Sequence, residues 1–171
     1  IIITNYSVTK ARKKTLAFST PVNAVQERLV VPRALADLAL TEMGSLIVSV
    51  PDGSAYQETA TKLAKRHQSI SVEVLDSSIS DEALVNGVAN GEFAASIVDS
   101  NMLDVLLDED GEAVAGPVLN RKRRIAWAVR PSSTELLNQI NQYITSERII
   151  TSDGSAEARD WEAIGERGVL R

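Results

Sequence analysis

The chain has 171 residues, with 18 lysine and arginine side chains against 23 aspartates and glutamates and a formal net charge of −5. This acidic balance argues against a general nucleic-acid binder, because such proteins need a basic face. The sequence contains no cysteine and one histidine, which excludes disulfides and thiol catalysis and leaves almost no material for a histidine-based triad or metal site. No apolar run approaches the roughly 20 residues of a membrane-spanning helix.

Short strand-like runs alternate with helical patterns along the chain, which predicts an α/β fold with a largely parallel sheet. In chain order, strands are expected at residues 1–4, 26–31, 45–50, 71–75, 94–98, 114–119 and 125–129. A helical turn is expected near residues 9–14, and helices at residues 34–40, 56–67, 82–90, 100–107 and 156–164. A further amphipathic helix begins at Ser133 or Thr134, and its apolar stripe is formed by Leu136, Leu137, Ile140 and Ile144.

Arg12 lies in a polar segment that follows the first predicted strand. In open α/β sheets ligands bind beyond the carboxyl ends of strands, and a planar guanidinium there can bind a carboxylate through two hydrogen bonds. The alternative interpretation is a solvated basic turn shared with Lys10, Lys13 and Lys14.

Gly53, Ser54 and Ala55 join the strongest predicted strand to a helix. Glycine allows close backbone approach, and a helix N-terminus offers N–H groups and the positive end of the helix dipole, which suits an anion or a carboxylate. The segment is neither a GxxxxGK[ST] nor a GxGxxG loop, so it gives poor support to nucleotide binding. The alternative is an ordinary strand-to-helix turn in which Ser54 caps the helix.

Asp99 ends the apolar run of residues 94–98. A carboxylate at the end of a strand can face a crevice and pair with an ammonium group, or it can cap the helix that follows; the two roles are compatible. No pair of carboxylates is distinguished as a general acid and base. The residues therefore predict no catalytic group, no cofactor and no metal ligand.

Four segments carry a family resemblance: residues 7–21 (Ser-Val-Thr-Lys-Ala-Arg, then Leu-Ala-Phe-Ser-Thr-Pro), residues 35–54, residues 90–99 (Asn-Gly-Glu-Phe-Ala-Ala-Ser-Ile-Val-Asp), and residues 126–137. In order and spacing they resemble the family 3 extracellular solute-binding proteins, the periplasmic amino-acid-binding class. The resemblance runs from about Ile1 to Ile150. It implies an α/β fold of the type II periplasmic-binding-protein kind, with one complete lobe plus part of the other.

The resemblance also implies a division of the chain and a set of ligand contacts. Partial lobe 1 would comprise residues 1–25 and 125–150, lobe 2 residues 26–124, and a linker with the beginning of a following domain residues 151–171. The lobes of this family close on the ligand by hinge motion, with hinge strands expected near residues 26–31 and 124–129. The implied ligand contacts are Arg12 to the α-carboxylate, Asp99 to the α-amino group, Ser54 and Ala55 at the helix start, and Ser7.

The sequence departs from the family pattern at several positions. An aromatic residue is expected after Pro21, where Val22 stands, a hydroxyl beside Ser54, where Ala55 stands, and an aspartate at Ala94. About 70–80 residues of the family's first half-lobe would lie before Ile1. We expect their absence to expose apolar surface and to promote self-association.

Residues 160–171 resemble the start of a further domain in membrane-bound lytic transglycosylases of the F type. Three hypotheses follow for a chain that is itself no enzyme. It is a periplasmic or extracytoplasmic module for an amino acid or small peptide, with a membrane transporter as partner; or the regulatory domain of a fused, membrane-anchored lytic transglycosylase; or the effector-binding domain of a transcriptional regulator.

Overall fold

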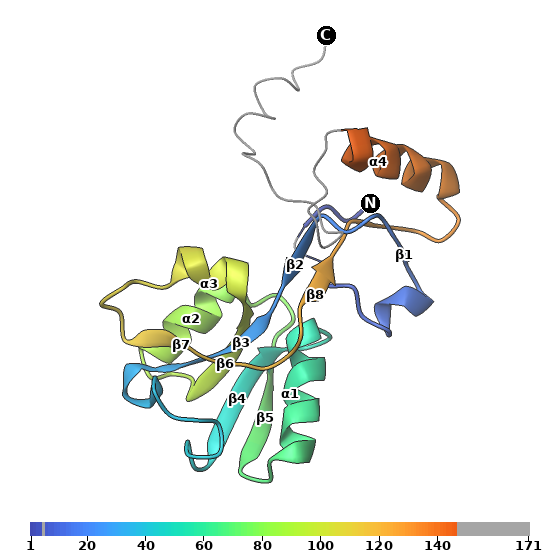
Figure 1. The fold of residues 1–171 in the computed structure, drawn as a ribbon. Helices are drawn as coiled ribbons and strands as arrows, with labels where there is room; N and C mark the ends of the chain where they lie inside the picture. Colours follow the sequence, from blue (N-terminus) through green and yellow to red (C-terminus); the bar gives the residue numbers. More distant parts are fainter. Residues whose placement is uncertain (5, 147–171) are drawn as a thin grey trace. The chain divides into compact units, whose positions relative to one another are not determined.

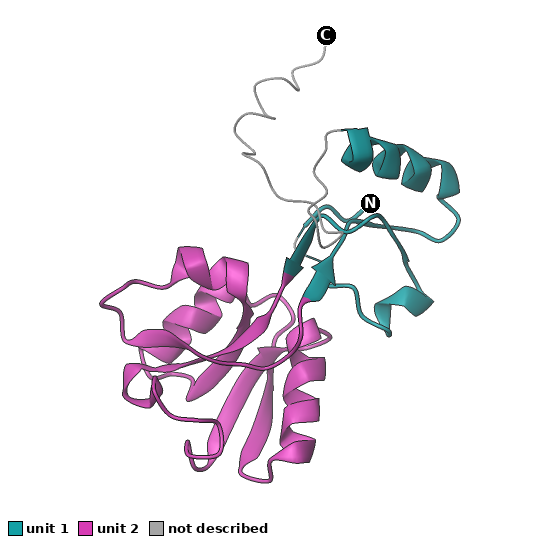
Figure 2. Ribbon diagram, in the orientation of Figure 1, with its two compact units in different colours: residues 1–24, 123–171 teal, residues 25–122 magenta. Residues whose placement is uncertain are grey.

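The computed structural model describes residues 1–4 and 6–146. The predicted helix at 156–164 and the predicted domain start at 160–171 lie outside these residues. The chain divides into two compact units, unit 1 with residues 1–24 and 123–171 and unit 2 with residues 25–122 (Figure 2). The chain therefore passes from one unit to the other twice.

Unit 2 is built on a five-stranded sheet in the order β5-β4-β6-β3-β7 (Figure 1). The strands are β3 (Glu27–Pro32), β4 (Leu46–Pro51), β5 (Ile70–Leu75), β6 (Ala95–Asp99) and β7 (Ala113–Val118). β4 runs parallel to β5 and β6, whereas β3 is antiparallel to β6 and β7. The sheet is thus mixed, and the prediction of a largely parallel sheet was wrong for this half, because β3 enters from unit 1 without a crossover helix.

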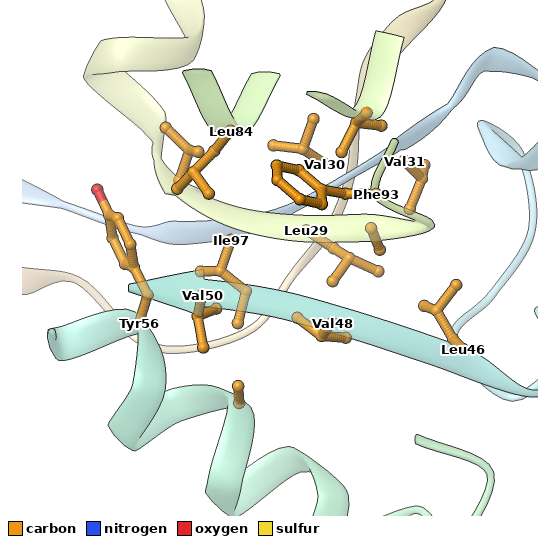
Figure 3. Close-up of a cluster of buried hydrophobic side chains, with 14 of the residues drawn as sticks. Leu29, Val30, Val31, Leu46, Val48, Val50, Tyr56, Leu84, Phe93 and Ile97 are labelled. Atoms are coloured by element: carbon orange, nitrogen blue, oxygen red, sulfur yellow. The ribbon is translucent and has the colours of Figure 1, made fainter. Parts of the chain in front are cut away.

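Three helices follow strands of this sheet: α1 (Ala55–Arg66), α2 (Asp81–Ala89) and α3 (Ser100–Leu106). α1 packs against β4 and β5, and α2 against β3, β6 and β7. All five residues of β6 are buried, as expected for a strand covered on both faces. Figure 3 shows Val30 and Leu84 on one side of β6, and Ile97 and Val50 on the other.

Unit 1 contains two short antiparallel strand pairs and one long helix. β1 (Ala17–Phe18) pairs with β9 (Ala128–Val129), and β2 (Asn23–Val25) with β8 (Arg123–Ile125). The remaining elements are the 3₁₀ turn η1 (Arg12–Lys14) and α4 (Thr134–Ser146). Ile140 and Ile144 of α4 pack with Val129 in a small core, whereas Leu136 is 40% exposed, so the apolar stripe is narrower than predicted.

Three predicted elements differ from the structure in their type or their length. Residues 34–40 form only the 3₁₀ turn η2 (Arg33–Leu35) and a following tight turn, because the N–H groups of Ala36 and Leu38 donate to carbonyls three residues back rather than four. Residues 1–4 make one isolated bridge, Ile2 to Ala128, instead of a strand. The predicted strand at 125–129 is divided between β8 and β9. The remaining predicted strands and helices of the described residues are confirmed within a few positions.

Within the residues that the structure describes, no helix is both long and apolar enough to cross a membrane.

The interior of α2 generates a test of the packing. Gly87 lies in this helix, and a Cβ built on it meets the ring of Phe93. Alanine normally stabilises a helix relative to glycine, but the clash predicts that Gly87→Ala lowers the free energy of unfolding by about 1–3 kcal/mol. Urea denaturation measures the loss. Adding Phe93→Leu to the Gly87→Ala variant should restore part of the lost free energy of unfolding. A Gly87→Ala variant as stable as the parent chain would contradict this packing.

Candidate functional site

The start of α1 is a tightly organised strand-to-helix turn. The Ser54 hydroxyl accepts a hydrogen bond from the Gln57 N–H at 3.0 Å and donates to the Pro51 carbonyl at 2.7 Å. The Gln57 side chain in turn accepts from the Gly53 N–H at 2.8 Å, and Gly53 has a φ of 64°, which favours glycine. The prediction that Ser54 caps this helix is confirmed. The first turn of α1, beginning with the buried Ala55, presents its N–H end at this edge of the sheet.

Asp99 lies at the same edge as Ser54. β4 and β6 are parallel neighbours, so their carboxyl ends, which lead into Ser54 and Asp99, lie side by side. Asp99 occupies the N-cap position of α3 but makes no side-chain capping hydrogen bond, and the residue is only 3% exposed. The structure thus brings Ser54, Ala55 and Asp99 together at the position where open α/β sheets bind ligands.

Tyr56 is a component of this edge that sequence reasoning missed. Its buried hydroxyl donates a hydrogen bond to Asp81 Oδ2 and accepts one from the Asp99 N–H, each at 3.3 Å. Burial, followed by the nearby carboxylates of Asp99 and Asp81, raises the pKa of Tyr56 above its ordinary value, so the phenol keeps its proton. Nothing in the local sequence distinguishes this tyrosine, because its partners come from two other elements.

Glu27 is a second carboxylate that the sequence did not single out. It is fully buried on β3, directly opposite Asp99 in the antiparallel register, so both side chains project from the same face of the sheet. Its Oε2 accepts hydrogen bonds from the hydroxyl of Thr59 in α1 and from the side-chain amide of Asn120. Asn120 Oδ1 also accepts from the Glu27 N–H, at 3.0 Å. This cluster ties α1 to both chain segments that lead towards unit 1.

Arg12 in unit 1 is held by aromatic and backbone contacts. Its guanidinium carbon lies 3.9 Å from the centroid of the Tyr6 ring, and its Nη1 donates to the Ser7 carbonyl at 3.0 Å. The Tyr6 ring stacks on Phe18 of β1, with 6.2 Å between the ring centroids. The half-buried guanidinium is therefore fixed at one face by a cation–π contact. Neither aromatic residue was predicted to act here, because the chain must turn back for Tyr6 to reach Arg12.

Ser7 is almost completely buried and forms an isolated bridge with Ile125. What it supplies to Arg12 is its main-chain carbonyl, through the hydrogen bond to Nη1. The predicted residues are therefore distributed over the two units, with Ser7 and Arg12 in unit 1 and Ser54, Ala55 and Asp99 in unit 2.

The two units carry opposite charge. The described residues of unit 1 include seven lysines and arginines and a single glutamate, whereas unit 2 has seven lysines and arginines against sixteen aspartates and glutamates. The net charge of the whole chain conceals this separation. By charge alone, unit 1 attracts anionic groups and unit 2 attracts cationic groups.

The described residues contain no group of three acidic or histidine side chains arranged to hold a metal ion. Their chemistry at the edge of unit 2 is that of a helix N-terminus beside a buried carboxylate. The chemistry at η1 in unit 1 is that of a positioned guanidinium. These are elements for binding charged groups.

A mixed sheet with helices on both faces, linked by two chain crossings to a second unit, defines the type II periplasmic-binding-protein fold. An amino acid ABC transporter substrate-binding protein, AbpA, from Streptococcus pneumoniae, solved with L-arginine, matches with a TM-score of 0.70 at 20% identity, over 83% of this chain and 59% of that chain. A solute receptor for L-cysteine from Neisseria gonorrhoeae has the same TM-score and identity, over 83% and 56%. At such identities these likenesses show the fold.

Residues 1–158 match the bacterial extracellular solute-binding proteins, family 3, and the chain belongs to this family. A curated relative, the membrane-bound lytic murein transglycosylase F of a Shewanella species, is 26% identical over 151 residues. The match covers 87% of this chain and 31% of the relative, so the chain spans about a third of that protein. The family predicted from the sequence motifs is thereby confirmed.

The environment of Asp81 predicts a pH dependence of stability. Burial raises the pKa of this carboxyl, although the Tyr56 hydrogen bond lowers it in part. A raised pKa in the folded state means that this contribution to stability is lost as the pH rises from the ordinary 3.8 through the folded value. Asp81→Asn should therefore gain stability relative to the parent chain between about pH 4 and pH 7, by under about 1 kcal/mol after solvent screening.

Asp76 provides the matched control for this titration. Hydrogen bonds from the Ser78 hydroxyl and N–H lower the pKa of this exposed carboxyl, so its contribution has the opposite sign and is lost as the pH falls. Asp76→Asn should lose stability relative to the parent chain as the pH rises. Urea denaturation of both variants, from a pH well below the ordinary value of 3.8 up to about pH 7, measures the difference, because the Asp76 contribution changes below that value and the Asp81 contribution above it. Identical pH profiles would contradict the assignment.

Proposed function

We propose that the chain is a solute-binding module for a free amino acid or short peptide, with charged contacts supplied by residues of both units. Arg12 of unit 1 binds the α-carboxylate, and Asp99 of unit 2 binds the α-ammonium group. Ser54 and the N–H end of α1, beginning at Ala55, add polar contacts, and Ser7 acts on the carboxylate through Arg12. The observation that carries the proposal is the fixed guanidinium of Arg12, which Tyr6 and the Ser7 carbonyl hold in one orientation.

The charge separation between the units supports a ligand with both charges. A zwitterion is matched by one cation, one anion and one helix N-terminus, since each of its charged ends then meets a group of opposite sign. The family membership and the amino acids named for the solved proteins of the same fold point to the same ligand class.

Ligand uptake proceeds in this proposal by hinge closure. The chain crosses between the units after residue 24 and after residue 122, close to the paired strands β2 and β8. Two neighbouring crossings allow a bending motion while limiting the directions in which the units move. On this basis the units correspond to a partial lobe 1 and a complete lobe 2, and residues 151–171 to a linker and the beginning of a following domain.

The relatives favour a regulatory role within a longer protein. Because the curated relatives are lytic transglycosylases and the matched region is a solute-binding domain, this module senses a solute without itself cleaving the cell wall. It acts outside the cytoplasm, tethered through the rest of the protein. A membrane transporter is the alternative partner. Sequencing the encoding gene beyond Arg171 for a catalytic domain discriminates between the two.

Removal of the Arg12 guanidinium tests the binding proposal. The twenty L-amino acids are first screened by thermal shift with the 171-residue chain, and the tightest binder is titrated by calorimetry. Arg12→Ala should weaken its affinity by at least about tenfold, because a charge-assisted contact contributes ~1.5–3 kcal/mol. Lys13→Ala, an exposed cation in the same turn, is the matched control. Equal affinities of the parent and Arg12→Ala chains would exclude this site.

A further inference from the structure

Tyr56 connects the proposed ammonium site to a helix that contributes none of the predicted ligand contacts. It is the second residue of α1, its hydroxyl accepts from the Asp99 N–H at the end of β6, and it donates to Asp81 at the start of α2. One phenol oxygen therefore joins three elements of unit 2. The ring is buried in the core, so the hydroxyl has little freedom to move away.

The direction of these hydrogen bonds follows from the donors available. A phenol has one proton, and the Asp81 carboxylate accepts it; the oxygen is then left with lone pairs directed at the Asp99 N–H. Because burial and the carboxylates of Asp99 and Asp81 raise the pKa of Tyr56, the proton stays on the phenol near neutral pH. Asp81 thus sets the orientation of the hydroxyl group that holds the backbone of Asp99.

The Asp99 backbone needs such a constraint, because β6 ends at this residue and α3 begins at the next. The direction of the Asp99 side chain depends on the backbone torsions at this junction. The N–H contact with Tyr56 is therefore a main-chain anchor placed at the residue whose carboxylate faces the proposed ligand.

We propose that Tyr56 is a positioning residue for the ammonium end of the binding site, and that Asp81 orients Tyr56 for this task. The proposal rests on the proposed function, since it concerns the same Asp99 carboxylate. It predicts that the tyrosine hydroxyl affects recognition of the ligand's charged amine and leaves recognition of its carboxylate unaltered.

Substitutions of single groups separate this role from simple packing. Tyr56→Phe removes the hydroxyl and keeps the buried ring. Asp81→Ala removes the acceptor, whereas Asp81→Asn keeps an oxygen acceptor and should retain most of the effect. Tyr143→Phe, at a 40% exposed tyrosine of α4 in unit 1, is the matched control for the loss of a phenol hydroxyl.

The first measurement follows the Asp99 amide by ¹⁵N–¹H spectroscopy in the 171-residue chain without ligand. Loss of the hydrogen bond should shift the Asp99 amide proton upfield in Tyr56→Phe and Asp81→Ala, less in Asp81→Asn, and not in Tyr143→Phe. An Asp99 amide that is unchanged in Tyr56→Phe overturns the positioning role, whatever the ligand.

The second measurement compares two probes by calorimetry: the tightest-binding L-amino acid from the screen and the 2-hydroxy acid with the same side chain. Tyr56→Phe should weaken binding of the amino acid about tenfold, the equivalent of one hydrogen bond to a charged site, and of the hydroxy acid less than about twofold. Equal weakening for both probes shows a packing effect and overturns the proposal.

The two measurements distinguish failure of this inference from failure of the proposed function. If no amino acid binds the parent chain while Tyr56→Phe still shifts the Asp99 amide proton, the proposed function is wrong. The role of Tyr56 in ligand binding is then wrong as well. If the parent chain binds an amino acid and Tyr56→Phe binds it equally well, only the present inference fails.

Discussion

The parallel pairing of β4 with β6 is the constraint on which the rest of unit 2 depends. Because the two strands are neighbours and run in one direction, the chain leaves both at the same edge of the sheet, and this places the start of α1 beside Asp99. The burial of β6 on both faces makes this pairing stable. The contact of the Tyr56 hydroxyl with the Asp99 N–H follows from that register.

Unit 1 orients one charged side chain, that of Arg12, with fewer elements. A long, flexible arginine side chain loses much rotational freedom when it binds a ligand, and this loss weakens affinity. Tyr6, itself stacked on Phe18, and the Ser7 carbonyl restrict the Arg12 side chain, which reduces this loss for the ligand proposed above. Such preorganisation suits the binding role proposed for this member of the solute-binding family.

Local sequence patterns predicted most helices and strands, because the formation of these elements depends largely on neighbouring residues. Ser54 before a helical run indicated a cap, and the apolar run that ends at Asp99 indicated a buried strand with a polar end. Such patterns gave no information on strand direction, so β3 was expected to be parallel to its neighbours. They also overestimated the helix at residues 34–40, because so short a run gains few helical hydrogen bonds and closes tight turns instead. Tyr56, Tyr6 and Glu27 were missed because their partners are distant in sequence.

The sequence by itself determined the family and most of the succession of strands and helices, and it singled out Arg12 and Asp99 as candidate ionic contacts, because motif order and hydrophobic period are properties of the linear chain. Only the tertiary structure decided which groups support them. The Asp81–Tyr56–Asp99 contacts join α2, α1 and β6, and the Arg12–Tyr6–Phe18 stack joins η1 to residues on both sides of it. Hydrogen bonds and ring contacts act over a few ångströms, so they form only when folding brings such segments together.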